Sequence, residues 1–143
     1  MKLISWNIRG CGNLGKWKTL NCKIRQENPD IIFLQETKCS SGGLDNIKDK
    51  LWKRSHVMAT DVVDQSRGIT ILLQPHSVEF SHWWANKFAL MADFCLMDSR
   101  VRGTLGNIYG PSSFLEKQSF VDLLNWLKEQ LEQGLWVLGE ILI

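Results

Sequence analysis

This sequence lacks the long apolar runs and the N-terminal signal that mark membrane and secreted proteins. It has only three prolines and one tyrosine, and no apolar run approaches the roughly 18 residues that cross a membrane. The N-terminal stretch MKLISWNIRG is interrupted by Asn7 and Arg9 too early for a secretory signal peptide. We therefore expect a protein of the nucleus or cytoplasm that is neither secreted nor membrane-bound.

Motifs built from cysteine, histidine or charge are also missing. The four cysteines form no C-x-x-C pair, which disfavours a zinc or thioredoxin-type site and favours reduced thiols. The three histidines have no convergent spacing, and a formal net charge of +2 is too small to indicate a polyanionic partner. Basic clusters at 16–25 and 48–54 are interpreted as the solvated faces of helices.

What the sequence does contain is enough apolar material for one domain. Hydrophobic residues make up 44% of the 143 residues, and seven are tryptophan. Apolar runs and helical periodicity alternate along the chain without a repeat or linker, which is typical of an α/β domain. The predicted strands are 2–8, 30–35, 56–62, 68–74, 77–84, 88–97, 100–110 and 135–142, and the predicted helices are 16–27, 44–54 and 114–133.

Two strand–helix–strand units are expected to bring polar residues to one edge of a sheet. A crossover helix joins parallel strands, and parallel strands end at the same edge. Strands 2–8 and 30–35 would therefore bring Asn7 beside Gln35 and Glu36. Strands 100–110 and 135–142 would do the same for Asn107 and Tyr109. Such an edge is where α/β proteins build their sites, but the spacing does not say what the site binds.

Four short motifs in order resemble one protein family. They are SWNIRG (5–10), LQETK (34–38), NIYGP (107–111) and WVLG (136–139). Together they resemble the endonuclease/exonuclease/phosphatase superfamily, and most of all the endonuclease domains of non-LTR (LINE-type) retrotransposons. The resemblance implies a deoxyribonuclease-like fold, an α/β two-sheet sandwich flanked by helices. It also implies that residues 1–143 are the N-terminal part of such a domain, so that the sandwich is truncated and incomplete.

The resemblance assigns roles to individual residues. Glu36 would be the metal ligand for Mg²⁺, or for Mn²⁺ in its place, and Asn7 and Tyr109 would be catalytic. One carboxylate, together with water molecules and a substrate phosphate, is a suitable set of ligands for a hard cation such as Mg²⁺. Contacts to the phosphates of DNA, the partner of the intact family, are expected from Arg9, Lys38 and Asn107.

The sequence departs from the family where the chemistry is completed. After WVLG the family continues with Gly-Asp-Phe-Asn, whereas this chain has Gly139-Glu140-Ile141-Leu142-Ile143. A later Asp motif and a Ser-Asp-His motif have no counterpart. We expect an uncovered sheet face that allows self-association, and a chain that is inactive alone, so whether it is an enzyme stays open. The alternatives are a phosphodiesterase or phosphatase of the same fold acting on a small phosphorylated substrate, and a non-enzymatic fragment that at most binds nucleic acid.

Overall fold

The computed structural model describes residues 1–10, 12–39, 41–60, 68–130 and 134–141. Within these residues strands and helices alternate as the sequence predicts. The elements are β1 (Leu3–Asn7), α1 (Leu14–Glu27), β2 (Ile31–Gln35), α2 (Ser41–Leu51), β3 (His56–Ala59), β4 (Ile69–Leu73), β5 (Val78–Ala85), β6 (Ala89–Leu96), β7 (Arg102–Tyr109), a 3-10 turn η1 (Phe114–Glu116), α3 (Lys117–Gln130) and β8 (Leu135–Ile141). Residues 61–67, which include the end of the predicted strand 56–62, lie outside the described residues.

The first sheet has the strand order β1-β2-β4-β3. β1 and β2 run parallel, as predicted, and β4 is antiparallel to its neighbours β2 and β3. All five residues of β2 are buried, which explains its nearly unbroken apolar sequence. In the register of this sheet Asn7 pairs with Gln35, so β1 and β2 end together.

The second sheet has the order β5-β6-β7-β8. β5, β6 and β7 form an antiparallel meander, and α3 connects β7 to the parallel strand β8. The second strand–helix–strand unit is thus confirmed. In its register Asn107 pairs with Gly139 and Tyr109 pairs with Ile141.

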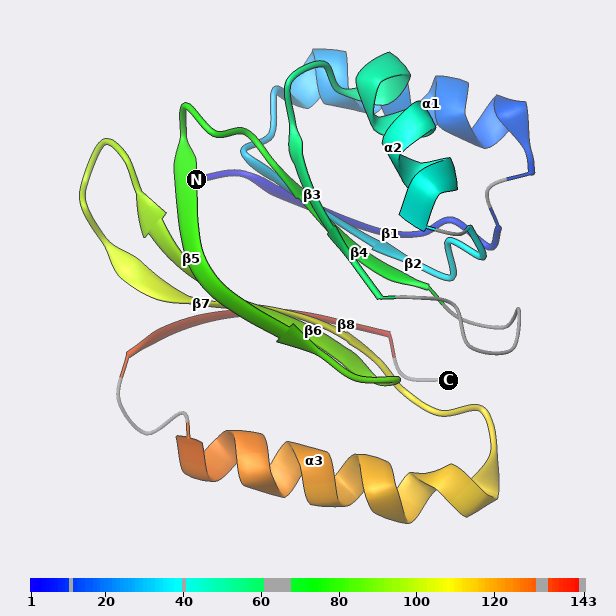
Figure 1. Ribbon diagram of the computed structural model, residues 1–143, viewed down its shortest axis with the longest axis vertical. Coiled ribbons are helices and arrows are strands. Elements are labelled where there is room, and N and C mark those ends of the chain that lie inside the picture. The colour runs from blue at the N-terminus through cyan, green and yellow to red at the C-terminus, as the bar shows by residue number, and fades with distance from the viewer. Residues whose placement is uncertain (11, 40, 61–67, 131–133, 142–143) are drawn as a thin grey trace.

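Three apolar cores bind four layers together (Figure 1). The largest lies between the sheets and includes Phe33, Ile71, Leu90 and Leu105, all fully buried. A second core joins the first sheet to α1 and α2, and a third joins the second sheet to α3. The order helix, sheet, sheet, helix places the ends of the strands at the rim of a sandwich.

The helix boundaries follow from local capping. α1 begins at Leu14, two residues before the predicted start, because Asn13 accepts a hydrogen bond from the backbone amide of Gly15 at 2.9 Å. It ends where Asn28 adopts a left-handed conformation with φ of 46°. α3 begins three residues later than predicted because 114–116 form the separate turn η1.

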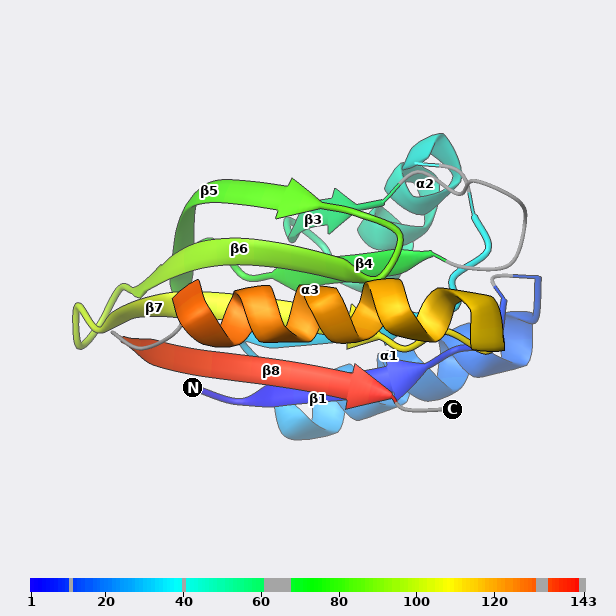
Figure 2. The same cartoon turned by 90° about the horizontal axis from the view of Figure 1, so that it is seen from below.

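The sandwich has one side where both sheets end in a parallel strand. β1 is the edge of the first sheet and β8 the edge of the second. Figure 2 shows these two strands on the same side of the molecule. The side chains of Leu135 and Leu138 on β8 are 44% and 47% exposed. None of the helices described is long and apolar enough to cross a membrane.

Candidate functional site

The candidate site lies where β1 and β2 end. The pairing of these strands continues into the loops that follow, because the amide of Ile8 donates to the carbonyl of Gln35 at 3.0 Å and that of Gly10 to Glu36 at 2.7 Å. The ammonium group of Lys16 on α1 also donates to the carbonyl of Ile8 at 2.8 Å. The loops that carry the candidate residues are thus held to each other and to a helix.

Glu36 is the centre of this site, and it is held from both sheets. Its Oε1 accepts a hydrogen bond from Nδ2 of Asn7 at 2.9 Å and from the hydroxyl of Tyr109 at 2.6 Å. Asn7 belongs to β1, whereas Tyr109 ends β7 in the other sheet. The structure therefore brings together the three residues to which the sequence assigned the metal and catalytic roles. We call Asn7, Glu36 and Tyr109 the rim triad.

One oxygen of Glu36 remains available for a ligand. Both donors reach Oε1, and no residue in the described part of the chain donates to Oε2. Partial burial raises the pKa of Glu36, but the hydrogen bonds from Asn7 and Tyr109 and the charges of Lys38 and Arg9 outweigh it, so the pKa lies below its usual value. An ionised carboxylate with a free oxygen suits a hard divalent cation that keeps most of its waters.

Arg9 and Lys38 flank Glu36 on exposed loop positions. Both are close enough for their charges to act on its carboxylate. Arg9, Glu36 and Lys38 have positive φ angles of 50°, 51° and 52°, a left-handed conformation that non-glycine residues rarely adopt. Holding one such residue in this conformation costs about 1–3 kcal/mol. Such backbone strain persists where the surrounding structure enforces it, often at functional sites. Both cations lower the pKa of Glu36, so positive charge lies near its carboxylate.

Asn107 is not placed with the exposed residues. It is fully buried, and its Nδ2 donates to the carbonyls of Leu34 at 3.1 Å and Thr70 at 2.9 Å. Its Oδ1 accepts from Nε2 of Gln35 at 2.5 Å. A substrate contact from Asn107 requires exposed polar atoms, and these atoms are instead committed to the opposite sheet.

Sequence reasoning missed this contact between Gln35 and Asn107, which we call the buried amide bridge. It joins β2 to β7 directly beneath the rim triad, one residue before Glu36 and two before Tyr109. The signal was present in the sequence as an amide that ends the apolar strand β2 and an amide between Gly106 and Ile108 on β7. Their pairing depends on how the sheets stack, and sequence spacing does not determine that stacking.

No histidine of the described chain lies at this rim. His56 pairs with Leu73 at the far end of the first sheet, whereas Gln35 pairs with Ile69 at the rim end. The described residues contain no group of three His, Cys, Asp or Glu side chains that would hold a metal. Glu140 pairs with Ile108 through its backbone, while its side chain and residues 142–143 lie outside what the structure describes.

The cysteines differ in state. Cys22 and Cys95 are free thiols, as expected for reduced cysteines. Cys39, three residues beyond Glu36, is disulfide-bonded, so the expectation of reduced thiols is wrong for this residue.

Together, the two stacked sheets and their flanking helices define a class of fold that known structures share. No family model and no curated protein matches the sequence. The chain is, however, similar to an endonuclease/exonuclease/phosphatase family protein from Bacteroides thetaiotaomicron, with a TM-score of 0.76 at 12% identity over 98% of this chain and 62% of that chain.

Two further solved structures show the same likeness. D. rerio TDP2 complexed with a single-strand DNA product has a TM-score of 0.73 at 17% identity, with 98% of this chain and 59% of that chain covered. The mannosyl-6-phosphatase Bt3783 of B. thetaiotaomicron has a TM-score of 0.70 at 13% identity, with coverage of 98% and 64%. The expected α/β two-sheet sandwich flanked by helices is confirmed. The chain spans about three fifths of the length of these neighbours.

Proposed function

We propose that the rim triad binds a divalent cation together with a phosphate of DNA, as the first part of a Mg²⁺-dependent endonuclease domain. The observation that carries this proposal is the free Oε2 of Glu36, held in place by Asn7 and Tyr109 and flanked by Arg9 and Lys38. The likeness in fold to a family of nucleases and phosphatases supports it.

Each residue has a role that its position allows. Glu36 supplies the carboxylate ligand, and Asn7 orients that carboxylate. A bound Mg²⁺ would supply charge stabilisation at the phosphate oxygens. Tyr109 holds Glu36 by donating the one proton of its hydroxyl, so a hydrogen bond from Tyr109 to a phosphate oxygen would require that proton to leave Glu36. Arg9 and Lys38 position the phosphate by charge.

DNA in the nucleus or cytoplasm is the substrate that we favour for the complete domain. One support is the sequence of the motifs SWNIRG and NIYGP, which resembles that of LINE-type endonucleases. The other is the single-strand DNA product bound in the structure of the similar TDP2. A second candidate is hydrolysis of a small phosphorylated substrate, which the likeness to a mannosyl-6-phosphatase favours.

We further propose that the 143 residues alone do not hydrolyse phosphodiesters. The described rim offers one carboxylate and no histidine, so it lacks a base to activate water and a group to orient that base. Removing such a set from a hydrolase typically leaves only the effect of binding and polarisation. The chain would then bind the metal and phosphate without turning over.

The proposal is tested by measuring metal binding and activity separately. Titration with Mn²⁺, followed by paramagnetic broadening of backbone NMR signals, should broaden the signals of residues 7–10 and 35–38 first. Glu36→Gln should abolish this local broadening because it removes the charged ligand. Glu79→Gln, which changes an exposed acid on β5, is the matched control and should leave the broadening unchanged.

Activity is measured on supercoiled plasmid and on a phosphomonoester, each with Mg²⁺. We expect no cleavage of either above the Glu36→Gln background. Plasmid nicking that Glu36→Gln abolishes would overturn the proposed inactivity, and phosphomonoester hydrolysis would favour the second candidate. Failure of Mn²⁺ to bind near Glu36 would overturn the proposed metal site itself.

A further inference from the structure

A groove separates α1 from α2 on the outer face of the first sheet. Its volume is about 660 Å³, within the range of small-ligand sites, and none of the rim triad lines it. Figure 1 shows both helices on this outer layer, on the side of the first sheet away from the second. The sequence interpretation treated the basic residues of these helices as a solvated face, whereas the structure gathers several of them around one hollow.

The groove is fixed in shape by a contact between its walls. Nδ2 of Asn21 on α1 donates to the carbonyl of Leu51, the last residue of α2, at 2.9 Å. Leu51 belongs to the core beneath the helices, and Trp17 packs against that core. A ligand would therefore meet a preformed site and would not have to order the two helices.

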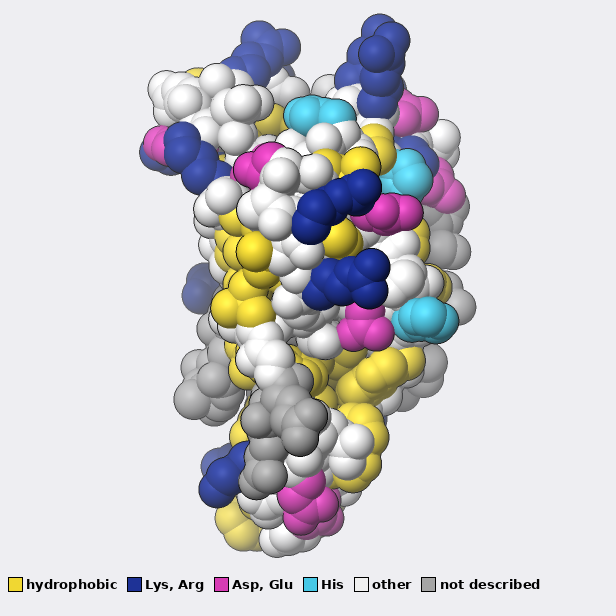
Figure 3. Space-filling model, turned by 90° about the vertical axis from the view of Figure 1, so that its left-hand side faces the viewer, with side chains coloured by type: hydrophobic (Ala, Val, Ile, Leu, Met, Phe, Trp, Pro, Cys, Tyr) yellow, Lys and Arg dark blue, Asp and Glu magenta, His cyan; other side chains and the backbone are white. Residues whose placement is uncertain are grey.

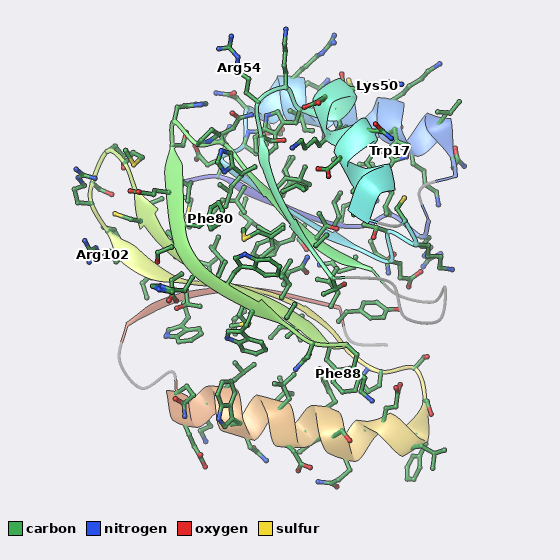
Figure 4. The ribbon with its side chains drawn as sticks, viewed as in Figure 1. Trp17, Lys50, Arg54, Phe80, Phe88 and Arg102 are labelled. Carbon is green, nitrogen blue, oxygen red and sulfur yellow. The ribbon has the colours of Figure 1, made fainter. Side chains whose placement is uncertain are left out.

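The apolar surface of the groove is aromatic on one side. Trp17 contributes a half-buried indole, and Leu14 is 77% exposed at the start of α1. Figure 4 labels Trp17 on α1 and Lys50 on α2. An indole at the surface of a hollow offers a face on which a planar ring can stack, and every nucleobase presents such a face.

Charge around the groove has one sign. Lys18, Arg25 and Lys50 line it, and none of the described residues that line it is acidic. Residues 14–27 and 41–54 carry eight Lys and Arg side chains against three acids, although the whole chain is only +2. Asn46 adds an exposed amide without a hydrogen bond to any described residue, able to donate and accept at the edge of a base.

Another large hollow on the molecule is lined by charges of both signs. It lies over β5, β6 and β7, where Arg100 and Arg102 alternate with Glu79 and Asp93. Figure 3 shows basic, acidic and His side chains intermixed on one face of the molecule. A hollow with both signs offers an anion no net attraction, so the groove between α1 and α2 is the better anion site.

We propose that the groove between α1 and α2 binds single-stranded DNA, with one base stacked on Trp17 and backbone phosphates bound by Lys18, Arg25 and Lys50. An acidic peptide would match the charge but would use neither the indole face nor the amide of Asn46. Duplex DNA holds its bases stacked and paired, so a base reaches the groove only from a single strand. The groove is a second nucleic-acid site, independent of the rim triad.

The experiment uses the whole chain and a fluorescent ten-residue oligo(dT), with binding followed by anisotropy at several salt concentrations. The triple variant K18E/R25E/K50E should weaken binding at least tenfold. It should also reduce the slope of the logarithm of the binding constant against the logarithm of the salt concentration by about two, as expected for the loss of three single-strand phosphate contacts. K23E changes an exposed Lys of α1 that does not line the groove, and it should weaken binding far less than K18E. Equal losses in K23E and K18E would show a general charge effect and overturn the proposal.

The free cysteines report where the strand binds. Cys22 lines the groove, whereas Cys95 lines the hollow of mixed charge. Bound oligo(dT) should slow alkylation of Cys22 severalfold, as read by peptide mass spectrometry, and leave Cys95 unchanged. Protection of Cys95 alone, or of neither, would overturn the proposal.

Three further arms complete the test. Trp17→Phe keeps an aromatic ring for packing and should retain most of the affinity, whereas Trp17→Leu should lose about fivefold or more through lost stacking. Poly-glutamate that protects Cys22 as well as oligo(dT) does would overturn the assignment to nucleic acid. Oligo(dT) binding is measured in EDTA, so that the metal-dependent rim triad does not contribute to it, and failure of the rim proposal and failure of this one are distinguishable.

Discussion

At the scale of single residues, the site depends on how the two oxygens of one carboxylate are used. Asn7 and Tyr109 both donate to Oε1 of Glu36, and Oε2 is left without a described donor. Had the donors been divided between the oxygens, a cation would have had to displace one of them. The arrangement also keeps Glu36 ionised, because each donor favours the charged form.

The lowered pKa of Glu36 predicts a pH dependence of stability. A carboxyl whose pKa is depressed by folding stabilises the native state above its ordinary pKa, here 4.5, and loses that contribution as pH falls through its folded pKa. Wild type should therefore exceed Glu36→Gln in unfolding free energy at pH 7, and the difference should shrink below about pH 4.5. Urea denaturation of both proteins between pH 7 and pH 3 measures this. A difference that stays constant to pH 3 would contradict the role of Glu36 as a stabilised carboxylate.

At the scale of elements, the rim exists because β2 and β7 are joined across the sandwich. Asn107 makes hydrogen bonds to Gln35, Leu34 and Thr70 and is fully buried. These contacts fix where β7 lies over β2, and so they fix the distance between Tyr109 and Glu36. We therefore regard Asn107 as a positioning residue, in place of the substrate contact that the sequence predicted.

Substitution of Asn107 by Leu should destabilise the protein by about 2–4 kcal/mol, because it leaves several buried polar groups without partners. Thr104→Val on the same strand is the matched control. It removes an exposed hydrogen bond to Asp93 of 2.8 Å and should cost less than about 1 kcal/mol. Urea denaturation gives both values, and the pH dependence attributed to Glu36 should also weaken in Asn107→Leu. Equal small losses in the two variants would show that the buried amide bridge does not hold the sheets.

At the scale of the whole molecule, the sandwich has two parallel-paired edge strands on one side. β1 and β8 are the edge strands there, and apolar side chains of β8 remain half exposed. Unpaired edges and exposed apolar surface favour association with another chain. The solved neighbours of this fold are longer than the present chain, which covers 59–64% of three of them.

We predict that a second copy of the chain associates through β8. Light scattering coupled to size exclusion should show a mass that rises with concentration, and Leu138→Lys should shift it towards the monomer. Leu115→Lys, at a site on η1 that is 89% exposed, is the control and should leave the mass unchanged. A concentration-independent monomer with a sharp cooperative melt would contradict this prediction.

The fold could be anticipated to a large extent from local patterns. The apolar run of β2, the helical period of α3 and the strand–helix–strand order are all local properties, and the structure agrees with each. Asn13 and η1 shifted two helix boundaries, because caps and turns depend on single side chains and local backbone geometry.

The candidate site could be anticipated only in part. Asn7 and Glu36 follow neighbouring parallel strands, so their meeting was predictable from the crossover rule. Tyr109 comes from the other sheet. The crossover rule predicted its place at the edge where its own strand ends, and only the family resemblance suggested that it meets Glu36. The groove between α1 and α2 was not foreseen, because it depends on which helix faces approach each other.

The sequence by itself determined the order of strands and helices and which residues follow which strand, because hydrophobic period and capping act over a few neighbours. Only the tertiary structure decided that Tyr109 shares an oxygen with Asn7, that Asn107 is a buried tie between sheets, and that scattered Lys and Arg residues surround one groove. Those outcomes depend on how sheets and helices stack, and stacking is set by the fit of whole faces rather than by neighbours in the chain.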